Sequence, residues 1–258
     1  MSIPTRSLRS AVLPLALLLC VLAPGARAEV ERVEVTSRST FAGGQAFGDV
    51  GAYEKVRGRL FYAVDPENAA NAPVVDLALA PKGADGKVRF SGDFVLLKPV
   101  DVRRGNRRLL YDVNNRGNLY MLRHFNDAVG SNDPASPEHA GNGFLMRQGY
   151  ALLWTAWNWD VRSGHDRLQI ELPIATENGA PIRQRIVAEI VNSSGREPYT
   201  SLPLALGNSR CYPALDPVDN SDAVLTVLDA PLAERTRIPL TEWRFDRSDG
   251  GALVPDPT

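Results

Sequence analysis

Apolar and polar side chains alternate through the first part of the chain, a period of two residues that is typical of β-strands. The clearest case is residues 56–64, where apolar positions alternate with arginines. Residues 88–97 form a similar segment, and the apolar run 74–79 lies between the two. This pattern predicts antiparallel strands joined by turns, with a β-bulge at Ser91–Asp93.

The pattern changes in the middle of the chain. Leu109–Val113 is an apolar segment that predicts a short buried strand, and the spacing of apolar residues over 119–129 predicts a helix that stops at Gly130. Tyr150–Trp157 is apolar at nearly every position, as in strands of parallel sheets that helices cover on both faces. Residues 109–157 therefore predict one βαβ unit in an otherwise antiparallel chain.

The last third returns to short alternating segments around the turn Asn178-Gly179. They predict strands near residues 168–174, 186–190, 224–228 and 238–245. Residues 196–222 contain several prolines and have no period, which predicts a long loop. The expected fold class is thus mixed α/β and β: a β-rich chain with an incomplete parallel-type sheet and an antiparallel β insertion.

Residues 1–28 resemble a secretory signal. Arg6 and Arg9 precede the apolar run 11–22, and Ala26-Arg27-Ala28 supplies small residues for cleavage after about Ala28. The apolar run is too short for a stable membrane span. We therefore expect an exported protein, periplasmic or secreted. Cys20 would suit a lipid anchor, but Leu19 stands where such signals have a small residue.

Charge and cysteine content narrow the function classes. Three arginines leave with the signal, so the formal net charge changes from −1 to −4, and no basic block remains. A nucleic-acid partner is therefore not expected. Cys211 is the only cysteine after cleavage, so stability must come from the core rather than from an intrachain disulfide.

No set of residues in the sequence forms a recognisable catalytic motif. The closest match to a nucleophile elbow, Gly207–Cys211 around Ser209, lacks the final glycine and a following helix. His124, His139 and His165 lack the spacing of zinc ligands and are expected to have surface or packing roles. We therefore assign no catalytic residue, no metal site and no cofactor.

Three of the four tryptophans lie within six residues, at the carboxyl end of the predicted strand 150–157. Trp154 is expected in the core. Trp157 and Trp159, followed by Asp160, could line a pocket and stack on a sugar ring, or could cover the edge of the sheet. The sequence leaves both alternatives open.

The turn after Leu109–Val113 is a second candidate site. Asn115, Arg116 and Gly117 lie between a strand and a helix, where acyl-transfer enzymes place backbone N–H groups that bind an oxyanion. Gly117 would then allow the substrate carbonyl to approach. The alternative is an ordinary turn capped by Asn115, with Arg116 in a surface ion pair with Asp112.

Four long segments of the chain resemble the amino-terminal half of a bacterial family of exported α/β-hydrolase domain proteins. They are "FGDVGAYEKVRGRLFYAVDP", "DFVLLKPVD", "GNRRLLYDVNNRGN" and "GNGFLMRQGYALLWTAWNWDV". The resemblance implies that 29–165 is part of a hydrolase-type domain and that 166–258 is a β-rich insertion region. It also implies that a complete family member hydrolyses esters or related acyl substrates. In the same resemblance, residues 109–113 form the sheet strand before the oxyanion loop.

The chain departs from the family in its catalytic residues. Family members carry a glycine-framed serine nucleophile, an acid and a histidine, and no serine of this chain occupies that motif. We therefore expect this chain to be inactive alone and to need a missing carboxyl-terminal hydrolase half. The alternative is a self-sufficient, exported, β-rich protein that binds a carbohydrate or another small ligand.

Overall fold

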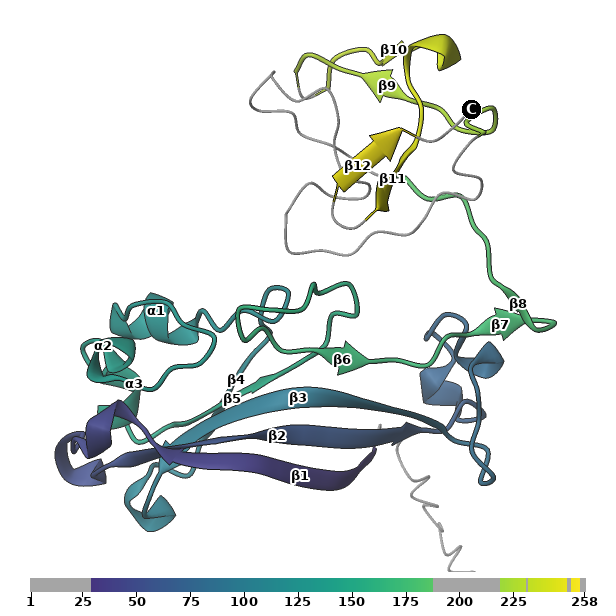
Figure 1. The fold of residues 1–258 in the computed structure, drawn as a ribbon. Coiled ribbons are helices and arrows are strands. Elements are labelled where there is room, and N and C mark those ends of the chain that lie inside the picture. The colour runs from purple at the N-terminus through teal and green to yellow at the C-terminus, as the bar shows by residue number, and fades with distance from the viewer. Residues whose placement is uncertain (1–28, 188–218, 231, 250–251, 256–258) are drawn as a thin grey trace, which may run out of the picture.

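The computed structural model describes residues 29–187, 219–230, 232–249 and 252–255 (Figure 1). This described part is β-rich, with few helices and one mixed sheet of six strands. The strands are β1 Glu29–Thr40, β2 Tyr53–Val64, β3 Val88–Pro99, β4 Leu109–Asp112, β5 Ala151–Thr155 and β6 Ile170–Glu171. Their order is β1-β2-β3-β5-β4, and β6 pairs with β3. The prediction of a β-rich mixed fold is confirmed.

The antiparallel strands β1, β2 and β3 form the long side of the sheet. The alternation over 56–64 lies within β2, which pairs with β3 along its whole length without a register shift. The predicted bulge at Ser91–Asp93 is therefore wrong. Gly92 instead marks a change of partner, because Phe94 pairs with β5 whereas Gly92 pairs with Ile170 of β6.

The predicted βαβ unit is present. β4 and β5 are parallel, with Leu109 opposite Ala151 and Asp112 opposite Trp154, and β5 lies between β3 and β4. The crossover contains three short helices, α1 Met121–Asn126, α2 Pro137–Ala140 and α3 Phe144–Arg147.

Helix α1 ends earlier than the spacing predicts. Asp127 adopts a left-handed φ of 52°, and its N–H donates to the carbonyl of Leu122, which closes the helix before Gly130. Val129 therefore lies outside the helix, and both Val129 and Phe125 of α1 are exposed instead of buried.

The hydrophobic core lies on one face of the sheet, beneath α1, α2 and α3 (Figure 1). Strand residues that share a face by register, such as Tyr53, Leu97, Leu152 and Trp154, all point into it. The hydroxyl of Tyr53 donates to the carbonyl of Tyr150 at 2.9 Å. Burial raises the pKa of Tyr53, so this hydroxyl keeps its proton and stays a donor.

The opposite face of the sheet carries many apolar side chains, and no α-helix of the described ranges covers it (Figure 1). Val33, Val35, Leu109 and Tyr111 are exposed there, and Leu153 is only partly buried. The expectation that helices cover residues 150–157 on both faces is therefore wrong for the described residues. The expectation of a buried strand at 109–113 is also wrong, because β4 is an edge strand of the sheet and Leu109 and Tyr111 are exposed.

Several predicted strands are shorter than expected or absent. Residues 74–79 contain a 3-10 helix, η4 Leu77–Leu79, after a left-handed turn at Asp76. The turn Asn178-Gly179 is confirmed, between β7 Thr176–Glu177 and β8 Ala180–Pro181. The remaining 3-10 helices are η1 Ala42–Gly44, η2 Gly48–Val50, η3 Ala69–Asn71, η5 Val102–Arg104 and η6 Leu240–Glu242.

The described residues after 218 form two separate hairpins. They are β9 Thr226–Val227 with β10 Thr236–Arg237, and β11 Asp246–Asp249 with β12 Ala252–Pro255. The predicted strand 238–245 is instead η6 and irregular chain. Most of the predicted loop 196–222, Ser209 included, lies outside the described residues, as does the signal segment 1–28. Every helix within the described ranges is too short or too polar to cross a membrane.

Candidate functional site

The carboxyl ends of β4 and β5 lie together because the two strands are parallel neighbours. Side chains connect β4 and β5 close to these ends. The indole N–H of Trp154 donates to Asp112 Oδ2 at 2.8 Å. The hydroxyls of Tyr111 and Thr155 lie 2.7 Å apart. Adjacent carboxyl ends of this kind are where α/β sheets form binding sites.

The two loops that follow these strands contact each other directly. The indole N–H of Trp157 donates to the carbonyl of Asn114 at 2.5 Å, and Arg116 Nε donates to Asp160 Oδ2 at 3.1 Å. The backbone N–H of Arg116 donates to Asn158 Oδ1 at 3.2 Å. The structure therefore brings Arg116, Trp157 and Asp160 together, although the sequence suggests Asp112 as the partner of Arg116.

Asn114 anchors the turn after β4 and is not among the residues that the sequence singles out. Its side chain is 2% exposed, donates to the carbonyl of Thr155 at 2.7 Å and accepts from the N–H of Gly117 at 2.8 Å. Asn115 is exposed and does not cap α1, whose N-cap is Tyr120. An asparagine therefore fixes the turn, as the capped-turn alternative predicts, but this residue is Asn114 and not Asn115.

Gly117 is required by the packing of a neighbouring segment. Its φ is 75°, and a Cβ at this position would lie 2.6 Å from the carbonyl oxygen of Leu168. The N–H of Leu168 donates to the carbonyl of Gly117 at 3.0 Å. The sequence attributes this glycine to an approaching substrate, whereas in the fold the backbone of Leu168 occupies that side.

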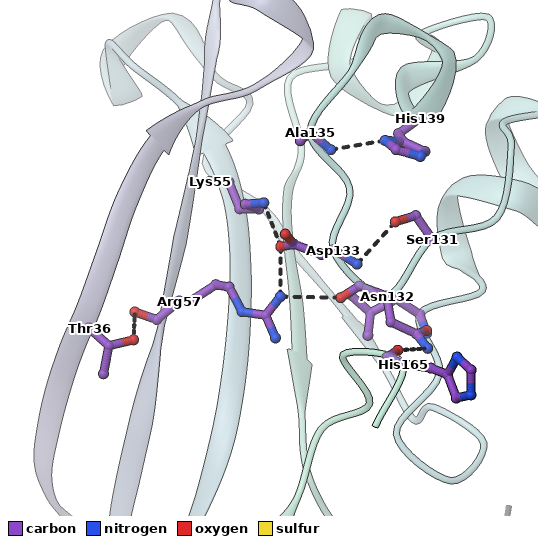
Figure 2. Close-up of polar contacts among 10 residues, drawn as sticks. Thr36, Lys55, Arg57, Ser131, Asn132, Asp133, Ala135, His139 and His165 are labelled. Carbon is purple, nitrogen blue, oxygen red and sulfur yellow. Dashed lines mark hydrogen bonds and ion pairs between the residues drawn. The ribbon is translucent and has the colours of Figure 1, made fainter. Parts of the chain in front are cut away.

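Asn132 connects the start of the crossover to the loop that carries His165, and Figure 2 shows its contact with His165. Its Oδ1 accepts from the N–H of Leu119 at 2.9 Å, and its Nδ2 donates to Asn118 Oδ1 at 3.1 Å and to the carbonyl of His165 at 2.8 Å. One carboxamide thus fixes the start of the crossover against the segment that leads to β6. Nothing in the local sequence distinguishes Asn132 from an ordinary loop residue.

Next to Asn132, Asp133 accepts hydrogen bonds from two cations of β2 (Figure 2). Lys55 Nζ and Arg57 Nη1 each lie 2.6 Å from Asp133 Oδ1. The side chain of Lys55 is only 7% exposed, so the carboxylate of Asp133 replaces the water that would otherwise stabilise its ammonium group. Partial burial acts to raise the pKa of Asp133, but the hydrogen bonds from Lys55 and Arg57 outweigh it and hold the pKa below its ordinary value.

The histidines have structural contacts. His139 Nδ1 accepts from the N–H groups of Ala135 and Ser136 at 3.0 and 3.2 Å, as part of the capping box of α2 (Figure 2). His124 packs edge-on against the ring of Tyr120. Within the described residues, no group of His, Cys, Asp and Glu side chains is arranged to hold a metal ion.

Replacing Asp160 by asparagine tests the link between the two loops. The side chains of Arg116 and Asp160 are 22% and 15% exposed, so loss of the charge leaves a partly buried guanidinium without its counterion. We expect the free energy of unfolding to fall by about 1–2 kcal/mol in urea titrations. Asp101→Asn is the control, because its partner Arg103 is 85% exposed and should contribute little. Equal effects of the two variants would contradict the assigned role of Asp160.

No protein-family model, no curated protein and no solved structure matches this chain. Its function is therefore inferred from the chemistry of the two loops and from the sheet that carries them.

Proposed function

We propose that the described sheet is the amino-terminal part of an exported serine-hydrolase-like protein of the α/β type, which acts on esters or related acyl substrates. The signal-like segment 1–28 supports export. The observation that carries the proposal is the placement of β5 between β3 and β4, parallel to β4, with the loops after both strands joined by the Arg116–Asp160 ion pair.

The uncovered parts of the sheet also support the proposal. β4 is an edge strand with exposed Leu109, Tyr111 and Val113, and Leu153 of the neighbouring β5, which pairs with Tyr111, is only partly buried. Exposed apolar edges and faces of this kind invite aggregation unless further strands and helices cover them. A parallel sheet that continues past β4 would pair with this edge, and its crossover helices would cover the face beside it. A self-sufficient binding protein explains this surface less well.

In this proposal the turn after β4 contributes to the oxyanion hole. The N–H groups of Arg116 and Gly117 already donate to Asn158 and Asn114, so they fix the shape of the turn. Asn115 is the exposed residue of the three, and because its backbone pairs with that of Asn118, the proposal assigns the oxyanion donor to its side-chain amide. The serine nucleophile and its partners would belong to the part of the sheet beyond β4.

A fluorophosphonate probe tests the proposal. Residues 29–258 alone should give no covalent serine adduct, because none of their serines stands in a glycine-framed motif. Co-production with the polypeptide encoded downstream in any frame should increase soluble yield and create one reactive serine. Labelling of 29–258 alone that Ser209→Ala abolishes, or a downstream sequence without such a serine, would overturn the proposal.

A further inference from the structure

We propose that the acyl group processed at this site is carried by a carbohydrate, with a pyranose ring stacked on Trp157 and Trp159; this inference rests on the proposed hydrolase function. Both tryptophans directly follow β5, in the loop that contacts the candidate oxyanion turn. The inference thus names the substrate class of the same site.

The indoles of Trp157 and Trp159 are both exposed to solvent. Trp157 is 49% exposed and Trp159 is 40% exposed, although Trp154 of the same segment is completely buried. Tryptophan is the largest side chain, so two exposed indoles two residues apart give this one loop a large accessible aromatic area. Such a surface suits the apolar C–H face of a sugar ring.

The Trp157 indole is held in place before a ligand arrives. The hydrogen bond from the Trp157 indole to the carbonyl of Asn114 fixes the ring against a residue that is itself buried. A ring that is fixed in this way loses little conformational freedom when a ligand stacks on it.

The two loops after β4 and β5 also carry polar groups. Exposed Asn115 and the partly buried Arg116 and Asp160 lie in the same pair of loops, and their planar amide, guanidinium and carboxylate groups can hydrogen-bond with hydroxyls. The uncovered sheet face has a different composition, with valine, leucine and tyrosine, and suits protein rather than sugar. Aromatic and polar groups together are what an amphipathic ring requires.

The reaction follows from this placement. With the ring on the indoles, an acyl ester of one hydroxyl would extend toward Asn115, the proposed oxyanion donor. Hydrolysis breaks the bond between the acyl carbon and the sugar oxygen; water supplies a hydroxyl to the acyl carbon and a proton to the sugar oxygen. The products are a carboxylic acid and the free sugar hydroxyl.

The test measures sugar binding and needs no catalysis. Residues 29–258 are run in affinity electrophoresis through gels that contain acetylated xylan, deacetylated xylan, hydroxyethyl cellulose, amylose or dextran. We expect retardation by at least one polysaccharide, and Trp157→Ala and Trp159→Ala should each weaken it about three- to tenfold. Phe125→Ala, which removes an exposed aromatic ring from α1, is the control and should bind normally.

Trp157→Phe guards against a folding defect, because it keeps an aromatic ring although it loses the indole hydrogen bond and part of the ring area; it should retain part of the binding. No retardation in any gel, or equal retardation of wild type and both alanine variants, would overturn the inference. If the protein binds sugar but fails the fluorophosphonate test, the sugar-binding surface stands and the proposed hydrolase function is overturned. A reactive serine without sugar binding would remove only the substrate class.

Discussion

Asp133→Asn is expected to lower the free energy of unfolding by about 2–3 kcal/mol. The substitution removes the only charge opposite Lys55 that the described contacts show, and the Lys55 side chain is 7% exposed. A buried ammonium without a counterion is strongly destabilising. The expected loss is smaller than for a fully buried pair, because the Asp133 side chain is 45% exposed and water partly screens it. Urea titration of wild type and variant gives the difference.

A double variant shows whether Lys55 is the cause. Lys55→Met combined with Asp133→Asn replaces the buried ammonium by an apolar side chain of similar length, so most of the lost stability should return. A double variant that is no more stable than Asp133→Asn would show that the buried charge is not responsible.

The same pair predicts a pH dependence. The pKa of Asp133 is lower in the folded protein than its ordinary value of 3.8, so its stabilising effect is complete above that value. The effect is lost as the pH falls through the lower, folded pKa. The difference in stability between wild type and Asp133→Asn should therefore be constant at neutral pH and shrink below about pH 4.

The sequence predicts those parts of the fold that depend on local periodicity. β2, β3, β4 and β5 follow from alternation or from short apolar runs, and the βαβ unit follows from their spacing around a helical segment. The carboxyl-end position of Trp157 and Asp160 follows from the same pattern. Elements whose apolar residues pack against the sheet can thus be predicted from the sequence.

The polar contacts that hold the site are different, because their partners are far apart in sequence. Lys55 and Asp133 are separated by 78 positions, and Asn132 and His165 by 33. A lone asparagine or aspartate in a loop has no local signal that identifies such a partner. For this reason the sequence singles out Asn115, whereas the buried anchor of the turn is its neighbour Asn114.

Apolar patterning also fails to show what covers a sheet face. Tyr150–Trp157 would have the same sequence whether helices of this chain, further strands or another polypeptide cover Leu153 and its neighbours. The pattern predicts that Leu153 is buried, but only the assembled structure can show which segment covers it.

Gly117→Ala should destabilise the protein by about 3 kcal/mol and disturb the candidate site directly. Part of the loss, about 1 kcal/mol, comes from a left-handed φ of 75° that alanine adopts poorly. The larger part comes from the clash of the new Cβ with the Leu168 backbone, 2.6 Å from its oxygen and 2.8 Å from its nitrogen. Because the Leu168 N–H donates to the Gly117 carbonyl, its amide should also exchange faster with solvent.

Gly86→Ala separates the two contributions. Gly86 has a nearly equal φ of 77°, but an added Cβ meets no atom within 4 Å. This control should therefore lose only the backbone contribution, about 1 kcal/mol. If the two variants lose equal stability, the contact with Leu168 is not what selects glycine at 117, and the space beside this residue would be available to a substrate carbonyl. If Gly117→Ala loses much more, the segment before β6 closes that side of the turn, and a substrate must approach from the side of Asn115.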